Sequence, residues 1–423
     1  MEKRFFIILK LFLFLNLIFI SPAFCRKVKD INILIQNVIK GIKENGTEVW
    51  IDTAEPTEVR KAGELGVTGG TSNPALITEA IKKNPAYYAR RIFEIASKYS
   101  GESDLLLKIR NTLERLGIEE DPLSKAILLE LTADLIENAL KNFSGPMSWE
   151  VDPRFYNDAQ AMIEEARLIY EIAERRDLDL NRIYIKIPAT EMGLVATEVL
   201  ISEGINVNLT LVFSIAQALE GLRRYELGID KARERGLEIK NIHMCISPFL
   251  GRWDDFLKKQ GFNIVDSEGN PVAGLYFAKL LHQRLREEIG LREKIREETG
   301  KDPLPNPPRI IMASIRGTYH VQQLLGADIL TIPPKVLFSP DFASINTDYP
   351  TIDRKIPSAL VEQLLNIELF QRSMKDRNFY ERGGLSFTEI DQHPLVVEGN
   401  KKFIEPYQEL LKLIGNILTS PQP

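Results

Sequence analysis

Short apolar runs and amphipathic stretches alternate along most of this chain. Eight of the runs have the length and the β-branched content of buried strands, and turn residues bound them. They span residues 49–52, 66–72, 146–151, 183–189, 205–213, 242–249, 309–315 and 328–334. Segments between them, such as NDAQAMIEEARLIYEIAERR, repeat apolar residues at the spacing that is typical of surface helices. The alternation predicts βα units and a parallel sheet.

The number of these units indicates the architecture. Eight βα units over roughly 300 residues match a (β/α)8 TIM barrel. An open doubly wound sheet is the alternative, but no Gly-x-Gly-x-x-Gly sequence follows the first strand. Residues 79–145 and 253–308 interrupt the alternation, and we expect helical insertions there. We assign residues 26–350 to the barrel, with its N-terminal helix and insertions, and residues 351–423 to a C-terminal helical extension that packs on the barrel.

The N-terminal segment differs in composition from the rest of the chain. Residues 1–25, MEKRFFIILKLFLFLNLIFISPAFC, have a basic start, a long apolar run and small residues near Ala23, which is the form of a secretory signal. A membrane tether and a wrongly chosen start codon are alternatives. We therefore leave this leader out of the fold prediction.

Composition excludes several classes of function. A net charge of -5 argues against a nucleic-acid-binding protein, although a small basic pocket for phosphates stays compatible with it. Cys25 and Cys245 are the only cysteines, and neither CxxC nor HExxH occurs, so we predict no disulfide framework and no metal site. We expect the scattered histidines to pack in the interior or to lie on the surface. They are His243, His282, His320 and His393.

One strand-like run, NRIYIKIPAT, contains a lysine, Lys186, among apolar residues. A buried ammonium group is costly unless it is paired or neutralised. An edge strand whose lysine faces solvent is the ordinary explanation. The alternative is a desolvated amine with a lowered pKa that attacks a carbonyl group.

Polar residues at the ends of the other runs favour the second explanation. In a barrel, the carboxyl ends of the strands meet at one rim and carry the chemistry. A single such residue would mean little, since Asp52, for example, could cap the next helix. So many on one rim are hard to explain as caps, and they suit a Schiff-base site. They are Asp52, Asn73, Glu150, Asn208, Thr210, Ser247, Phe249, Arg252, Ser314 and Arg316.

Four segments resemble a known family, the transaldolases. GTSNPALI resembles their first signature, and IYIKIPATEMGLVATEVLISEGINVNLTLVFSIAQA is similar to their active-site segment. SWEVDPR and ISPFLGR are also similar to family segments. The resemblance covers residues from about 48 to about 340 in order. It implies a (β/α)8 barrel that transfers a dihydroxyacetone unit between phosphorylated sugars through a lysine Schiff base, without a metal or cofactor.

The resemblance also implies a role for each catalytic residue. Lys186 resembles the Schiff-base lysine, and Asp52 resembles the acid/base that takes the C4 hydroxyl proton as the C3–C4 bond breaks. Glu150 and Thr210 are similar to the pair that holds the catalytic water. A free lysine has a pKa near 10.4, so only about one amine in a few thousand is neutral at pH 7. We expect burial and nearby arginine charge to lower that pKa.

The other residues are expected to bind substrate. Asn73 and Asn208 would hydrogen-bond the dihydroxyacetone hydroxyls. Guanidinium and hydroxyl groups suit phosphate oxygens. The distal phosphate would be held by Ser247, Arg252, Ser314 and Arg316.

The expected reaction takes dihydroxyacetone from sedoheptulose 7-phosphate or fructose 6-phosphate to glyceraldehyde 3-phosphate or erythrose 4-phosphate, in the pentose phosphate pathway. One alternative is a fructose-6-phosphate aldolase-type lyase. Such relatives tend to have Tyr and Gln where this chain has Phe249 and Glu150, which favours transfer. Another is a non-catalytic, exported sugar-phosphate-binding barrel.

The expected partners and location follow from that reaction. The partners are small sugar phosphates and not nucleic acid, and a homodimer is left open. Because the substrates are cytosolic, we expect a cytoplasmic protein. Export, or tethering through residues 1–25, is the alternative, and membrane contact is expected only if that leader is retained.

Overall fold

The computed structural model describes residues 22–99, 101, 103–376 and 383–420, with only the backbone for residues 22–29. Most of the predicted leader, residues 1–21, lies outside the described residues. No helix within these described ranges combines the length and apolar character that a bilayer crossing requires.

Eight parallel strands close into a barrel in which each strand pairs with its sequence neighbours and β8 pairs with β1. Each strand falls on one predicted run, with β1 beginning one residue before its run, so the predicted (β/α)8 barrel is confirmed and the open sheet is wrong. The strands are β1 Glu48–Asp52, β2 Gly69–Thr71, β3 Met147–Glu150, β4 Ile183–Pro188, β5 Val207–Val212, β6 Met244–Pro248, β7 Arg309–Met312 and β8 Ile329–Ile332.

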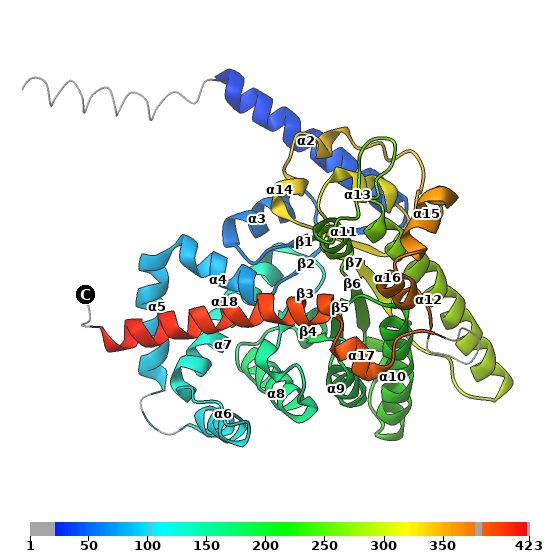
Figure 1. Cartoon of the computed structure of the whole chain (residues 1–423). Coiled ribbons are helices and arrows are strands. Elements are labelled where there is room, and N and C mark those ends of the chain that lie inside the picture. The colour runs from blue at the N-terminus through cyan, green and yellow to red at the C-terminus, as the bar shows by residue number, and fades with distance from the viewer. Residues whose placement is uncertain (1–21, 100, 102, 377–382, 421–423) are drawn as a thin grey trace, which may run out of the picture.

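Helices surround the barrel, fill both predicted insertions and form the C-terminal extension (Figure 1). The first group comprises α2 Pro22–Glu44, α3 Pro56–Glu64, α4 Pro74–Lys83, α5 Pro85–Lys98, α6 Asp104–Arg115, α7 Pro122–Asn142, α8 Ala159–Arg175, α9 Glu191–Ser202 and α10 Ile215–Glu234. The second comprises α11 Leu250–Lys259, α12 Ala273–Glu298, α13 Thr318–Gln323, α14 Pro334–Leu337, α15 Ser358–Leu365, α16 Glu368–Ser373, α17 Phe387–Asp391 and α18 Pro394–Thr419. Short 3-10 turns, including η1 Pro153–Phe155, join some of them.

Local sequence signals explain where several helices begin. Asn73, Asn84 and Asp121 each precede a proline, and each side chain accepts a hydrogen bond from the first turn of α4, α5 or α7. Asparagine and aspartate supply the capping oxygen, and proline tolerates the first helical position because it needs no hydrogen-bonded N–H group. The first of these caps, at α4, also sets the direction of the chain beside the barrel rim.

The barrel interior changes from apolar to polar along the strands. Its apolar layer is a cluster of Trp50, Tyr184, Cys245, Ile311 and Ile329. Side chains two positions apart on a strand share a face, so the next inward position on β4 is Lys186. The apolar layer closes one end of the barrel beneath the polar residues at the carboxyl ends.

Helix α18 crosses the polar end of the barrel. Figure 1 shows it as the long red helix that passes in front of the strands, and it packs against α4, α7, η1 and β5. Its buried face includes Phe403, Tyr407 and Leu411, which recur at four-residue spacing. Residues from the far end of the sequence therefore cover the site.

Candidate active site

Lys186 lies inside the barrel with a side-chain exposure of 3%. Its strand, β4, pairs with β3 on one side and β5 on the other, so the edge-strand explanation is wrong. The Nζ atom donates a 2.9 Å hydrogen bond to the Ser72 carbonyl oxygen and lies 3.1 Å from Glu150 Oε2. The amine is thus desolvated and held at the carboxyl end of the barrel.

Glu150 and Thr210 present buried oxygens beside this amine. Glu150 pairs in register with Lys186 across β3 and β4, and Thr210 lies two residues beyond Asn208 on β5. Among the described residues, Thr210 Oγ1 has no hydrogen-bond partner, and Glu150 Oε2 has only the ion-pair contact with Lys186 at 3.1 Å. Burial raises the pKa of Glu150, although the Lys186 charge opposes this. Buried oxygens that accept no hydrogen bond from the protein are suited to binding an ordered water.

Asp52 ends β1 and faces the same interior. Its Oδ1 accepts a 2.8 Å hydrogen bond from Thr71 Oγ1, which lies 2.6 Å from Thr331 Oγ1. Helix α3 is capped by Glu55 instead, so the capping explanation for Asp52 is wrong. Burial raises the pKa of Asp52, and the Lys186 charge and the Thr71 hydrogen bond offset that effect only in part. Such a carboxyl group can exchange a proton nearer to neutral pH.

Two asparagines are held by hydrogen bonds at the edge of the site. Asn208 Nδ2 donates to Ser148 Oγ at 2.9 Å, and Asn208 Oδ1 accepts from Ser247 Oγ at 2.6 Å. Asn73 Oδ1 accepts from the Leu76 backbone at 3.1 Å as the cap of α4. The Asn73 cap uses only the amide oxygen, so the amide nitrogen is the group that suits a substrate hydroxyl.

Two guanidinium groups meet at one side of the cavity. Arg316 pairs with Asp255 at 2.8 Å and donates to the Ser314 carbonyl oxygen at 3.2 Å. Arg252 Nη1 is buried and has no hydrogen-bond partner among the described residues. Burial and the Arg316 charge lower the pKa of Arg252 to about 10. Two adjacent guanidinium groups, one of which has an N–H group without an acceptor within the described ranges, are suited to binding a dianion.

Nine of the eleven predicted residues line one cavity of about 140 Å³, and Glu150 and Thr210 lie beside it. Ser314 adopts a left-handed backbone with φ of 64°, which is uncommon for a residue with a side chain and occurs often at functional sites. The nine residues are Asp52, Asn73, Lys186, Asn208, Ser247, Phe249, Arg252, Ser314 and Arg316.

A family model described as Transaldolase/Fructose-6-phosphate aldolase matches residues 49–414. The chain belongs to this family. A protein named Transaldolase 2 from Nostoc sp. is 27% identical over an alignment of 417 positions that covers 91% of this chain and 99% of that protein. A Transaldolase from Neisseria meningitidis serogroup C is 32% identical, over 71% of this chain and 82% of that protein. A Transaldolase from Renibacterium salmoninarum is 26% identical, over 89% and 95% of the two chains.

Two aromatic rings flank the lysine of this family member. The Lys186 amine lies 5.9 Å from the centroid of the Phe249 ring and 5.2 Å from that of Phe403. Arg252 also lies against both rings, at 5.5 and 5.6 Å. Phe249 is a predicted site residue, whereas Phe403, on α18, is one that the sequence analysis missed.

Three further lining residues were also missed, namely Thr71, Ala313 and Thr331. Thr71 lies in the GTSNPALI segment and Thr331 in the last strand-like run. The period of two along β8 could have identified Thr331 as inward-facing. For Phe403, the sequence offered only the apolar spacing of the C-terminal helix.

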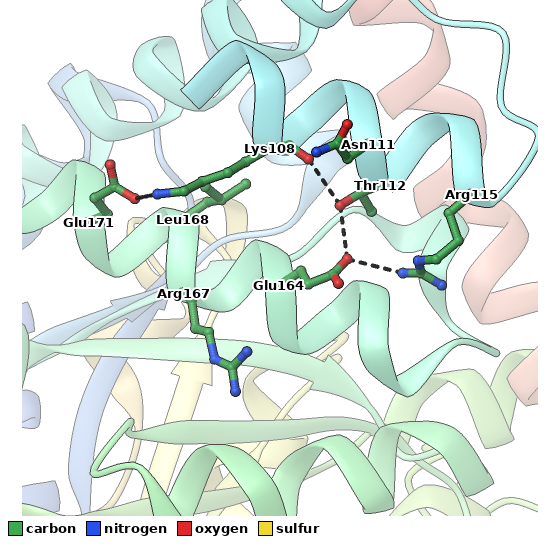
Figure 2. Close-up of a pocket in the computed structure, with 8 residues that line it drawn as sticks. All are labelled: Lys108, Asn111, Thr112, Arg115, Glu164, Arg167, Leu168 and Glu171. Carbon is green, nitrogen blue, oxygen red and sulfur yellow. Dashed lines mark hydrogen bonds and ion pairs between the residues drawn. The ribbon is translucent and has the colours of Figure 1, made fainter. Parts of the chain in front are cut away.

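A larger cavity of about 420 Å³ lies between α6 and α8, away from the barrel rim (Figure 2). Its cations are already paired. Lys108 Nζ lies 2.9 Å from Glu171, Arg115 Nη2 lies 3.0 Å from Glu164, and Arg167 also pairs with a carboxylate. Neutralised pairs offer little to a phosphate, so we do not assign the substrate site here.

Proposed function

We propose that this chain is a transaldolase that carries dihydroxyacetone as a Schiff base on Lys186. One observation carries the proposal: the Lys186 amine shares a buried cavity with a raised-pKa carboxyl group, Asp52, and with two guanidinium groups. Glu150 lies 3.1 Å from the same amine. These are the nucleophile, the acids and bases, and the anion-binding groups that the reaction requires.

Imine formation uses the pair beside the amine. The Lys186 nitrogen attacks C2 of the ketose, and a water held by Glu150 and Thr210 moves protons between nitrogen and the C2 oxygen, which leaves as water. The buried Oε2 of Glu150 and Oγ1 of Thr210, which accept no hydrogen bond from the described part of the chain, support this role. The product is a protonated imine, which withdraws electrons from the adjacent bond.

Carbon–carbon cleavage then uses Asp52. The carboxylate takes the proton of the C4 hydroxyl, the C3–C4 electron pair moves into the imine, and the aldose phosphate leaves. The enamine on Lys186 attacks the aldehyde carbon of the acceptor, and Asp52 returns the proton to the new hydroxyl. Hydrolysis of the imine releases the product ketose phosphate.

The guanidinium groups hold the phosphate end of each sugar. Arg252 has an unpaired buried donor and Arg316 lies next to it, so a dianion would relieve the repulsion between them. Anchoring that end places the reacting carbonyl at the amine and raises its effective concentration. This supports fructose 6-phosphate or sedoheptulose 7-phosphate as donors, and erythrose 4-phosphate or glyceraldehyde 3-phosphate as acceptors.

The test is incubation with fructose 6-phosphate, with and without erythrose 4-phosphate. A transaldolase forms sedoheptulose 7-phosphate only with the acceptor, and a lyase releases dihydroxyacetone without it. Failure of both reactions would leave a binding protein. Borohydride should also fix a three-carbon adduct to Lys186, and peptide mass mapping identifies the labelled residue.

We also propose that the reaction belongs to the cytoplasmic pentose phosphate pathway. Phosphorylated sugars are charged and do not cross membranes unaided, which supports a cytoplasmic location. A variant without residues 1–25 should be soluble and active. Recovery of a cleaved form outside the cytoplasmic fraction of the native cell would contradict this location.

A further inference from the structure

A buried histidine–aspartate pair lies behind the arginine side of the cavity. His320, on α13, and Asp254, on α11, have side-chain exposures of 0% and 3%, and His320 Nε2 lies 3.2 Å from Asp254 Oδ2. Neither residue lines the cavity. Among the described residues, neither atom has a hydrogen-bond partner, so the ion-pair contact between them is the polar contact that each makes. The proposed chemistry gives the pair no role.

The other nitrogen of the histidine contacts the arginine segment. The backbone N–H of Arg316 donates a 3.2 Å hydrogen bond to His320 Nδ1. Nδ1 must therefore carry the lone pair, and in the neutral ring the proton resides on Nε2, facing Asp254. A carboxylate opposite a ring nitrogen is the usual means of fixing a histidine tautomer.

Asp254 is itself held from the next helix. Its Oδ1 accepts a 2.9 Å hydrogen bond from the Gly274 backbone in the first turn of α12. A Cβ atom at Gly274 would lie 2.5 Å from the Leu250 carbonyl oxygen and 2.9 Å from Asp254 Oδ2, so the two helices approach too closely for any other residue. The carboxylate is thus held through Oδ1, and its Oδ2 faces His320 Nε2 at 3.2 Å.

The pair joins the two segments that carry the arginines. Asp254 follows Arg252 by two residues on α11, and His320 holds the backbone of Arg316. The backbone before Arg316 is strained, because Ser314 has φ of 64°, and its carbonyl oxygen accepts from Gly251 at 3.1 Å. A strained turn persists only where its surroundings hold it in place.

We propose that Asp254 and His320 are positioning residues that hold Arg316 where it binds the substrate phosphate. The proposal rests on the proposed function, in which Arg252 and Arg316 bind that phosphate. The pair touches no substrate. It sets the affinity for the phosphorylated end of the sugar by fixing one histidine tautomer.

Asp254→Asn is the decisive variant because it keeps the shape and reverses the tautomer. The amide oxygen must accept from Gly274, so its NH2 group faces His320 Nε2. That nitrogen becomes an acceptor, the proton moves to Nδ1, and two donors oppose each other at Arg316. We expect KM for fructose 6-phosphate to rise about tenfold, the scale of one unsatisfied buried polar group, with little change in kcat.

Simple electrostatics predicts the opposite sign. Loss of a negative charge near Arg316 should strengthen phosphate binding, as we expect for Asp255→Asn, the matched control that removes a neighbouring carboxylate without affecting His320. The inhibition constant of inorganic phosphate should therefore rise in Asp254→Asn and stay level or fall in Asp255→Asn. Transfer from unphosphorylated fructose should be the same in Asp254→Asn and the parent. The 15N shifts of His320 report the tautomer directly.

A second pair of variants covers the case in which Asp254→Asn does not fold. His320→Asn can place its side-chain oxygen at the Nδ1 position and should retain phosphate affinity, whereas His320→Leu, of the same shape, should lose it about tenfold. Equal affinities in these two variants, or a reversed tautomer with unchanged KM in Asp254→Asn, would overturn the positioning role while the transferase stands. A parent that neither transfers nor binds phosphate would overturn the proposed function, and this proposal with it.

Discussion

Lys125 and Lys186 are both buried in this protein, each with a side-chain exposure of 3%, but their surroundings differ in what is left unpaired. Lys125 Nζ donates to Asp152 at 2.7 Å, to Glu165 at 2.8 Å and to Tyr407 Oη at 2.6 Å. All three of its hydrogens have acceptors. Lys186 Nζ donates to one carbonyl oxygen and forms an ion pair with Glu150 Oε2 at 3.1 Å.

Helix α18 covers both lysines, with two aromatic residues one turn apart. Tyr407 packs its ring 5.0 Å from the Lys125 amine and also accepts from it, whereas Phe403 packs its ring 5.2 Å from the Lys186 amine. The hydroxyl of Tyr407 is the third hydrogen-bond acceptor of the Lys125 amine. The phenyl ring of Phe403 covers Lys186 without offering an acceptor.

Among the carboxyl groups around the two amines, Asp152 is the one whose pKa is lowered. Burial raises the pKa of Asp152, but Lys125 and Arg154 outweigh burial and hold that pKa to about 2, whereas burial raises the pKa of Glu165, the other carboxyl group at Lys125. Near Lys186, burial outweighs the charge, so the pKa values of Asp52 and Glu150 are raised. The Lys125 amine has three hydrogen-bond acceptors, whereas the Lys186 amine has one carbonyl acceptor and the Glu150 carboxylate at 3.1 Å. The comparison supports a structural role for Lys125 and the proposed nucleophilic role for Lys186.

The largest expected effect is that of Lys186→Met on turnover. Removal of the proposed nucleophile should lower kcat by at least about 10⁴-fold, because no other lysine of the described residues lines the cavity. Borohydride labelling should disappear, while the thermal unfolding midpoint should not fall. Labelling of another lysine, or turnover retained in the variant, would contradict the assignment of Lys186.

Lys125→Met should lower stability and leave turnover unchanged, which is the reverse of the result expected for Lys186→Met. Asp152 and Glu165 would be left buried without their shared cation, which should lower the free energy of unfolding by roughly 3–5 kcal/mol. The variant that still folds should keep its transfer activity. Urea unfolding measures the loss.

Lys82→Met is the matched control for this stability measurement. Lys82 is half-exposed and pairs with the exposed Glu409, so its loss should cost less than about 1 kcal/mol. Equal losses in the two variants would remove the distinction between a saturated buried lysine and a surface lysine.

Asp52→Asn should lower turnover and raise stability at pH 7. Turnover should fall by about 10²- to 10³-fold with loss of the acid/base. Because the folded-state pKa of Asp52 is raised, its contribution to stability is present below the unfolded pKa of about 3.9 and is lost as pH rises through the folded pKa. The variant should thus be more stable than the parent at pH 7. A gain that grew as pH fell towards 4 would contradict a raised pKa.

Much of the site was predictable because it depends on local pattern and barrel geometry. The eight strand-like runs define the barrel, and polar residues such as Asp52 and Glu150 close the runs at the end where parallel strands meet. The predicted strand ends were too wide in places, since β2 covers only Gly69–Thr71. Gly66, Val67 and Thr68 extend the predicted run before the strand begins, and Gly66 has a positive φ of 95°.

The residues contributed by distant segments were not predictable. Phe403 and Tyr407 reach the two lysines only because α18 packs across the barrel, and apolar spacing identifies the buried face of a helix but not its contacts. His320 and Asp254 likewise meet through packing of α11, α12 and α13. No spacing in the sequence marks either association.

Phe249→Tyr tests whether the aromatic cover of Lys186 controls water. A phenol here could orient the water near Glu150 and help it to protonate the enamine. We expect acceptor-independent release of dihydroxyacetone to rise several-fold and transfer to erythrose 4-phosphate to fall, with little change in stability. The ratio of dihydroxyacetone to sedoheptulose 7-phosphate measures the effect. A flat or lower ratio would remove water exclusion as the role of this ring.

Phe403→Tyr should have the smallest effect and bears most directly on the comparison. It gives Lys186 the residue type that Lys125 has from Tyr407, one turn along the same helix. The Lys186 amine lies over the Phe403 ring, 5.2 Å from its centroid, and the new hydroxyl would extend from the ring edge. The hydroxyl should therefore reach Lys186 only through a water. We expect a change of about two- to threefold in the same product ratio, since a bridged contact is weaker than a direct one.

The reciprocal variant, Tyr407→Phe, supplies the control for α18. It removes an acceptor from Lys125 and should cost about 1–3 kcal/mol of stability, the penalty of one unsatisfied buried donor, while leaving the product ratio unchanged. If Phe403→Tyr lowered turnover as strongly as Lys186→Met, the hydroxyl would be bonding the amine directly. The Lys186 amine would then lack one hydrogen-bond acceptor in the parent because Phe403 has no hydroxyl group.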